Sequence, residues 1–297
     1  MRLNSYCIRC LLDRQQERIG KFTDEEKKTA YMKKVAGIVG DSGDDDAAPL
    51  LVYRFNQVYQ EFFGEALDYS REKEEYNSYV MALEDRLYQE IQEASDPLAM
   101  AIIYARIGNY IDFGAMQHVE KEQFLKLFHD QEKNILTEDT YRQFMLDCEN
   151  GKEFLLLTDN CGEIVLDKLF VKELKKRFPH LHIAVMVRGS EVLNDATYQD
   201  AVTIGMCEEA EVVDNGNGIA GTVERYMPKE AIAMLDRADV ILSKGQANFE
   251  TMNGCGRNVY YSFLCKCDWF SKRFQVPKYT GLFLRERDIS PKSLIDI

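Results

Sequence analysis

Polar side chains that can hold a metal ion and a phosphate group follow four short apolar runs in the second half of the chain. The four loops begin at Asp159, Arg188, Asp214 and Lys244. If the runs are parallel strands, the loops meet at one edge of the sheet, where ligands bind in doubly wound folds. Carboxylate and amide oxygens suit hard ions, and Arg and Lys bind phosphate oxygens. The pattern therefore predicts a site for a divalent metal ion and a phosphorylated ligand.

Each loop, taken alone, has a simpler explanation. Aspartate and asparagine after a strand often form a turn or cap the next helix without binding any ligand. For a single loop that explanation is the better one. Four polar loops at one sheet edge favour a binding site, and that is our interpretation.

A glycine pattern within the third loop needs separate treatment. Residues 216–221 read GNGIAG, which has the GxGxxG form of dinucleotide-binding loops. Such loops open directly into a helix and are followed by an acidic residue that ends the next strand. Here Pro228 follows closely, and Asp239 precedes its strand. We therefore expect no nicotinamide or flavin dinucleotide.

The elements that must position these loops are short strands alternating with helices. Short runs at 154–157, 183–187, 211–213 and 240–242, apolar except for Glu211, are typical of strands buried on both faces. A helical pattern at 163–178 separates the first two runs. This alternation predicts right-handed crossovers, a mostly parallel sheet and the α/β class.

The first half of the chain has a helical pattern instead. Residues 72–94 contain no glycine or proline and predict one long helix. Asp96 and Pro97 predict the next helix start, with Asp96 as N-cap and Pro97 at the first helical position. We predict a helical N-terminal domain over 1–149 and an α/β metal-binding catalytic domain over 150–297.

Composition and charge argue against several kinds of partner. With 297 residues, 45% of them hydrophobic, the chain can bury a sizeable core. Its net charge of −13 repels nucleic acid and anionic membranes, although a local cation can still attract an anionic metabolite. We see neither the apolar segment of a signal peptide nor an apolar run long enough to span a bilayer. We expect a cytoplasmic protein; the sequence does not indicate its oligomeric state.

At the same loops the chain resembles the damage-control phosphatases, a family long described as a domain of unknown function. Gly108-Asn109 and IDFG at 111–114 match an upstream element of the family, and the similarity spans nearly the whole chain. Cys161 stands where alanine is more usual. The matching motifs are TDNCGE at 158–163, VRGS at 187–190, LNDAT at 193–197 and SKGQANFE at 243–250.

The resemblance implies a helical N-terminal region packed on a Rossmann-like three-layer α/β sandwich. It also implies a divalent ion, Mn²⁺, Mg²⁺, Co²⁺ or Ni²⁺, at the strand ends. The metal ligands of the family fall on Asp159, Asn160 and Asp195. The expected substrate is a small phosphorylated metabolite, such as a phosphosugar or a damaged side-product of metabolism.

Other residues inherit roles from the same motifs. The phosphate-facing groups of the family fall on Arg188, Asn194 and Lys244. Asn248 and Glu250 match positions whose role in the family is less defined.

Hydrolysis of a phosphate monoester is the chemistry that these residues would serve. A divalent ion reduces the repulsion between nucleophile and phosphoryl group and acidifies a water molecule. Arg188 and Lys244 would stabilise charge on the phosphoryl oxygens. Water is the preferred nucleophile and Asp159 is the rival. Glu163 or Glu250 would act as general base, although the helix dipole explains Glu163 equally well.

Two other functions stay open at this point. A carboxylate methyltransferase activity has been attributed to a eukaryotic branch of the family, but no glycine-rich loop suited to its cofactor follows the first strand. A non-catalytic protein that binds a phosphorylated ligand would use the same site.

The eight cysteines are expected to be thiols or metal ligands in a reducing compartment. Cys7 and Cys10 form a CxxC motif that resembles the mark of the mainly prokaryotic subfamily. They predict a second metal site, although a closed zinc site needs four ligands. Burial of two small hydrophobic side chains is the alternative.

Overall fold

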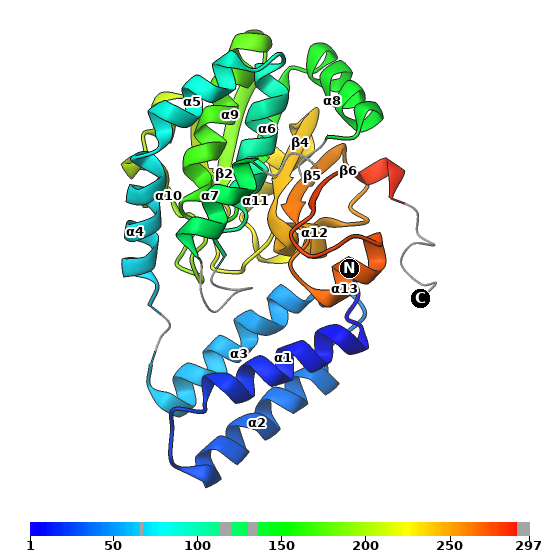
Figure 1. The fold of residues 1–297 in the computed structure, drawn as a ribbon. Coiled ribbons are helices and arrows are strands. Elements are labelled where there is room, and N and C mark those ends of the chain that lie inside the picture. The colour runs from blue at the N-terminus through cyan, green and yellow to red at the C-terminus, as the bar shows by residue number, and fades with distance from the viewer. Residues whose placement is uncertain (66–67, 113–119, 130–135, 290–297) are drawn as a thin grey trace.

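A six-stranded sheet lies at the centre of the molecule. The computed structural model describes residues 1–65, 68–112, 120–129 and 136–289. The strand order is β3-β2-β1-β4-β5-β6, and all neighbours are parallel except β5 and β6 (Figure 1). The prediction of a mostly parallel sheet is confirmed, and the first four strands coincide with the four apolar runs. The strands are β1 (Glu153–Leu157), β2 (His182–Val187), β3 (Glu211–Asp214), β4 (Val240–Lys244), β5 (Val259–Leu264) and β6 (Gly281–Arg285).

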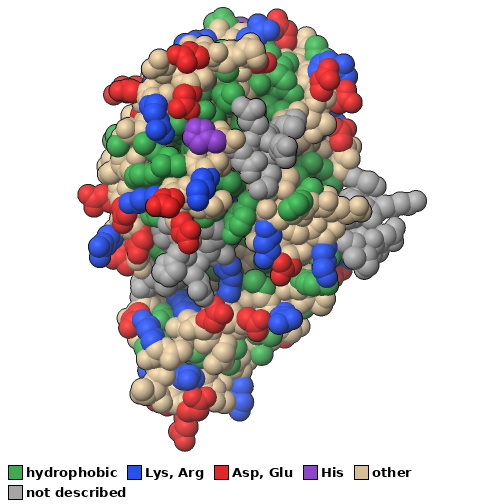
Figure 2. Space-filling model, in the orientation of Figure 1, with side chains coloured by type: hydrophobic (Ala, Val, Ile, Leu, Met, Phe, Trp, Pro, Cys, Tyr) green, Lys and Arg blue, Asp and Glu red, His purple; other side chains and the backbone are tan. Residues whose placement is uncertain are grey.

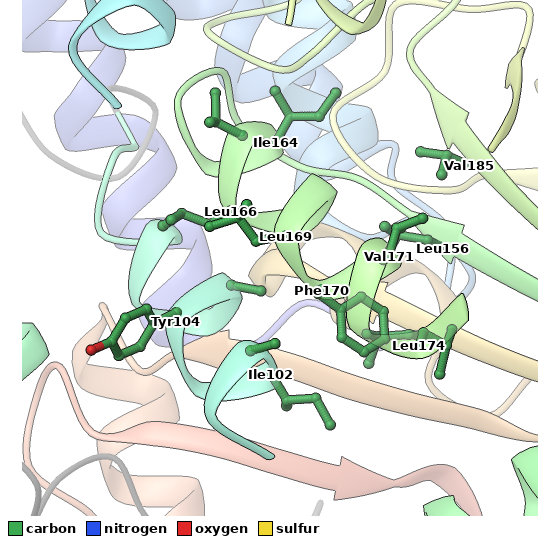
Figure 3. Close-up of a cluster of buried hydrophobic side chains, with 14 of the residues drawn as sticks. Ile102, Tyr104, Leu156, Ile164, Leu166, Leu169, Phe170, Val171, Leu174 and Val185 are labelled. Carbon is green, nitrogen blue, oxygen red and sulfur yellow. The ribbon is translucent and has the colours of Figure 1, made fainter. Parts of the chain in front are cut away.

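Helices cover both faces of the sheet. Alternate strand residues point to opposite sides, and both sets are apolar and need to be buried. Leu156 and Val185 pack with α6 (Pro97–Gly108) and α9 (Glu163–Arg177), whose side chains interleave in Figure 3. Leu155 and Met186 belong to the core on the other face. That core includes α11 (Lys229–Arg237), α12 (Gly245–Met252) and α13 (Asp268–Phe274). The predicted three-layer α/β fold is therefore confirmed.

The remaining helices fall into two groups. The first three form a bundle with its own hydrophobic cluster around Tyr31, Phe55 and Tyr59, at one end of the sandwich in Figure 1. The others share the core of the sheet. The domain boundary at 149/150 stays a prediction, whereas the hydrophobic cores divide between α3 and α4. These helices are α1 (Ser5–Arg18), α2 (Glu25–Gly40), α3 (Ala48–Phe63), α4 (Ser70–Met81), α5 (Glu84–Glu93), α7 (Lys121–His129), α8 (Glu138–Asn150) and α10 (Tyr198–Thr203).

Two helix predictions have opposite outcomes. Asp96 caps α6 as predicted, since its side chain accepts a hydrogen bond from Ala99 N at 3.0 Å. The single long helix over 72–94 is wrong, because a turn at Ala82 and Leu83 separates α4 from α5. A straight helix of that length would extend about 35 Å, well beyond the roughly 22 Å of α9 on which it packs. The turn keeps both halves on the core.

Close packing of α6 on α9 depends on a glycine. A Cβ atom on Gly108 would lie 3.0 Å from both Glu163 Cα and Leu166 Cδ1. Because residue 108 is glycine, the backbone of α6 can pack directly against the backbone at the start of α9. The next residue, Asn109, is thereby brought to the ends of the strands.

The surface has no single dominant feature on the face shown in Figure 2, where acidic and basic side chains are interspersed with hydrophobic ones. No helix in the described residues is both long enough and apolar enough to cross a membrane. The prediction of a cytoplasmic location remains untested by these observations.

Asp147 joins α8 to the edge of the sheet and allows a prediction about stability. Its carboxylate accepts hydrogen bonds from Tyr260 Oη at 2.6 Å and Asn258 Nδ2 at 3.1 Å. Burial opposes ionisation, but these hydrogen bonds and Arg285 lower the pKa of Asp147 overall. We expect Asp147→Asn to reduce the free energy of unfolding by about 1–3 kcal/mol at neutral pH.

The sign of the pH dependence follows from that lowered pKa. Stability from Asp147 is present above the unfolded pKa of about 3.9 and is lost as pH falls through the lower folded pKa. Urea unfolding at pH 6 and at pH 3 measures this, and the difference between parent and variant should shrink at the lower pH. A difference that grows on acidification would contradict the assignment.

Candidate active site

The four polar loops meet at the carboxyl edge of the sheet, and three of them contribute charged side chains that are buried there. Asp159 follows β1, Arg188 follows β2, and Lys244 ends β4. The loop after β3 has another task. Asp214 is exposed and accepts from Gly216 N at 2.9 Å, while Asn215 Oδ1 accepts from Gly189 N at 2.9 Å. Asp214 and Asn215 therefore serve to form the turn and to fix the neighbouring loop.

The three predicted metal ligands lie together. Residues 159–161 run beside 194–196, with a β-bridge between Asn160 and Asp195 and a hydrogen bond from Ala196 N to Asp159 O at 2.8 Å. The exposed fractions of Asp159, Asn160 and Asp195 are 5%, 2% and 3%. Backbone pairing therefore brings together side chains that lie 35 positions apart in the chain.

The two carboxylates of this group carry more negative charge than their surroundings balance. Burial is the main cause that raises the pKa of Asp159 well above its usual range, and repulsion from Asp195 and Glu163 adds to it. Burial also raises the pKa of Asp195 to about 6, although Arg188 opposes that shift. An added cation between them would relieve this cost.

Arg188 is the cation in direct contact with the group. Its Nε donates to Asp195 Oδ2 at 2.7 Å, and Nη2 lies 3.8 Å from Asp159 Oδ1. Nη1 donates to Gly221 O at 2.9 Å, and Nη2 donates to Asn248 Oδ1 at 3.3 Å. Asn248 thus helps to fix the guanidinium, and Gly221 of the GxGxxG pattern serves as an acceptor for it.

Lys244 does not lie where its predicted phosphate contact requires. Its ammonium group is fully buried and donates to Ala105 O at 3.0 Å, Glu163 Oε1 at 2.7 Å and Asp167 Oδ1 at 2.5 Å. The side chain points beneath α6 and α9 instead of along the strand axis. A residue at a strand end can face either layer, and the sequence does not show which.

The remaining predicted residues divide between the site and its surroundings. Asn194 is buried next to Asp195 and donates through Nδ2 to Ile111 O at 3.1 Å. Glu250 lies on α12, where burial raises its pKa to about 7, opposed by the N-terminal amino group, Arg14 and Arg273. Those charges belong to the α1 and α13 side of the molecule. The structure therefore groups Asn194, and not Glu250, with the predicted metal ligands.

Cys7 and Cys10 lie near the start of α1. Cys7 Sγ accepts from Asn4 Nδ2 at 3.2 Å, burial raises the pKa of Cys7 to about 11, and Cys10 is exposed. Within the described segments, no three His, Cys, Asp or Glu side chains are grouped so as to hold a metal ion. The second metal site and the CxxC subfamily stay predictions.

Sequence reasoning missed a second cation near Asp159. Lys266 follows β5 and its ammonium donates to Asp112 Oδ2 at 2.7 Å. After burial and the nearby carboxylates, Lys266 is the group that lowers the raised pKa of Asp159. The signal was a lysine after a buried strand, but the strand itself had not been predicted.

Comparison with known proteins identifies a family and several relatives of this chain. The damage-control phosphatase ARMT1-like domain model matches residues 3–282. A damage-control phosphatase of Archaeoglobus fulgidus is 28% identical over 276 residues, covering 90% of this chain and 93% of the relative. A damage-control phosphatase of Pyrococcus horikoshii is 26% identical over 196 residues, covering 63% of this chain and 65% of the relative.

A solved structure supports the fold. A DUF89 family protein from Pyrococcus horikoshii has a TM-score of 0.75 and 21% sequence identity, with 96% of this chain and 99% of that chain covered. Since the family model spans nearly all of the sequence, the chain belongs to the damage-control phosphatase ARMT1-like domain family.

Proposed function

We propose that this protein is a divalent-metal-dependent phosphatase acting on small phosphorylated metabolites. One observation carries the proposal: Asp159, Asn160 and Asp195 meet in a buried group, with Arg188 bound to one carboxylate. Family membership supports the phosphatase class. Metal dependence and substrate class are our additions.

The residues present fit a hard divalent ion. Two carboxylates and one carboxamide supply oxygen donors, which Mg²⁺ and Mn²⁺ prefer. The carboxylate of Asp159 lies directly against the backbone of Gly245, since a Cβ atom there would lie 2.0 Å from Asp159 Oδ2. The raised carboxyl pKa values indicate that positive charge is lacking there.

The other side chains would bind and orient the substrate. When bound, a divalent ion would neutralise phosphoryl charge and acidify a water molecule. Arg188, held by Gly221 O and Asn248, would direct its guanidinium at phosphate oxygens. Lys266 would supply the second positive charge that the sequence had assigned to Lys244. Because these groups are buried, they would act in a low dielectric.

A panel of sugar phosphates tests this function. We expect phosphate release with Mn²⁺, Mg²⁺, Co²⁺ or Ni²⁺ and at least about a tenfold loss with excess chelator, since the ion supplies several kcal/mol of charge stabilisation. Release that continues unchanged in chelator would contradict metal dependence. Thermal stabilisation by an ester without turnover would indicate a binding protein, and methyl transfer to protein carboxylates would indicate a methyltransferase.

A further inference from the structure

Glu163 has a fully buried carboxylate that accepts hydrogen bonds on both oxygens. Oε2 accepts from Asn109 Nδ2 at 3.0 Å, Asn160 Nδ2 at 2.9 Å and Asn160 N at 3.3 Å. Oε1 accepts from Lys244 Nζ at 2.7 Å. A carboxylate oxygen has about two acceptor positions, so the three donors on Oε2 crowd that oxygen while the ammonium of Lys244 bonds to the other. This arrangement suits a group that orients its neighbours, because each donor is a fixed part of the protein.

The neighbour most affected is the carboxamide of Asn160, which has one donor end and one acceptor end. Its Nδ2 lies 2.8 Å from Asp159 Oδ2 and 2.9 Å from Glu163 Oε2, both of them acceptors. With the nitrogen held by two carboxylates, the oxygen lies at the opposite end of the carboxamide. The reversed orientation would place the carboxamide oxygen against two carboxylates, so Asp159 and Glu163 together select the orientation seen here.

Asn109 is oriented in the same way. Its Oδ1 accepts from Leu264 N at 3.1 Å, which leaves Nδ2 to donate to Asp159 and Glu163. Two carboxamides thus present their nitrogens to the same pair of carboxylates. Their oxygens are turned away from Glu163.

The side chain of Glu163 is itself fixed by a buried ion-pair network with Lys244 and Asp167. Lys244 and Asp167 form an ion pair at 2.5 Å, and Lys244, Glu163 and Asp167 have side chains with 0% exposure. Ala105 O takes another hydrogen of the ammonium group. One buried cation between two carboxylates leaves the Glu163 side chain little freedom to rotate.

We infer that Glu163 is a positioning residue that fixes the carboxamide of Asn160 with its oxygen toward the bound cation, and that Lys244 and Asp167 fix Glu163. This inference rests on the proposed metal-dependent function. Residues that orient metal ligands in this way commonly change metal affinity by about 10–100-fold when replaced.

The test is metal affinity measured by titration calorimetry with Mn²⁺. Glu163→Gln replaces an acceptor by a donor, which meets Asn160 Nδ2 or the Lys244 ammonium and favours the reversed carboxamide. We expect Mn²⁺ binding to weaken by about 10–100-fold. Adding Asn160→Asp should recover at least about tenfold of that loss, because aspartate has oxygen at both ends and accepts from glutamine.

Glu163→Asp is a second background, in which Asn160→Asp should have the opposite effect on Mn²⁺ binding. It keeps the charge but shortens the side chain, so Mn²⁺ binding should weaken several-fold. Here Asn160→Asp should make binding weaker still, since two carboxylates would face each other. The matched control is Glu173→Gln, also buried on α9 but bonded to Gln92 and Lys176, and it should leave Mn²⁺ affinity unchanged.

Several results would overturn the inference. One is Mn²⁺ affinity that stays at the parent value in Glu163→Gln while phosphate release falls, which would make Glu163 a proton-transfer group. Another is that Asn160→Asp changes Mn²⁺ affinity in the same direction in the Glu163→Gln and Glu163→Asp backgrounds. Failure of the proposed function looks different: a parent that binds Mn²⁺ but hydrolyses no ester still shows the affinity changes. A parent that binds no divalent ion overturns both.

Discussion

Replacing Asp159 by asparagine is expected to lower phosphate release by about a thousandfold, equivalent to ~4 kcal/mol of transition-state stabilisation. Asparagine keeps the shape of the side chain and one oxygen that can accept from Asn109 and Asn160. It removes a negative charge from the proposed cation site. Steady-state kinetics with Mn²⁺ and a hydrolysed sugar phosphate measures the loss.

The same substitution should leave the metal-free protein as stable as the parent, or more stable. Asp159 is buried, and repulsion from Asp195 and Glu163 adds to the cost of its charge. Replacing a buried, poorly compensated charge by a neutral group of similar volume is often stabilising, here by about 1 kcal/mol. Thermal unfolding in chelator should therefore show no decrease, while stabilisation by added Mn²⁺ should disappear.

Asp214→Asn is the matched control for this experiment. Asp214 ends β3, much as Asp159 comes just after β1, but it is exposed, and within the described residues its side chain accepts a hydrogen bond from Gly216 N. Activity should stay within about twofold of the parent, as for most surface substitutions. Equal losses in the two variants, or stabilisation by Mn²⁺ that persists in Asp159→Asn, would remove Asp159 from the metal site.

These two aspartates also show how far the sequence predicts the site. Both follow an apolar strand, and both are followed by asparagine. Only the structure separates them, because the segment with Asp195 crosses beside Asp159, whereas Asp214 turns back onto its own loop. The strand-end position was readable from pattern, but the crossing segment was identified through family resemblance alone.

Strands were predicted well where they are uniformly apolar and less well where they are not. The runs that became β1 to β4 are short and apolar, as buried parallel strands should be. Residues 259–264 read VYYSFL, with two tyrosines and a serine, and were not singled out. Missing β5 meant missing Lys266 at its end, so Lys244 was the only lysine that the sequence offered for the phosphate.

Helix breaks and side-chain direction were the other limits. No glycine or proline marks the turn between α4 and α5, which results from the length of the core beneath it. Likewise, Lys244 ends a strand at the right edge, yet packing against Ala105, Glu163 and Asp167 directs it inward. Both outcomes depend on tertiary contacts that no local pattern contains.

Gly245→Ala is expected to reduce phosphate release by at least about a hundredfold, the effect of displacing a reacting group by about 1 Å. Gly245 has φ +79°, and an added Cβ would lie 2.0 Å from Asp159 Oδ2 and 2.2 Å from Asp159 Cγ. The carboxylate or the backbone must move, so Mn²⁺ affinity should fall together with turnover. Kinetics and Mn²⁺ titration of the same preparation measure both effects.

Gly254→Ala separates this displacement from backbone strain. Gly254 has φ +97°, also in the region that disfavours other residues, but nothing lies within 4 Å of its added Cβ. Gly254→Ala should lose about 1–2 kcal/mol of stability, the usual cost of a left-handed backbone for a residue with a Cβ, and Gly245→Ala should lose more because its methyl group also overlaps Asp159. Only Gly245→Ala should lose metal binding and activity. If Gly254→Ala were equally inactive, strain would explain the loss, and the contact with Asp159 would not.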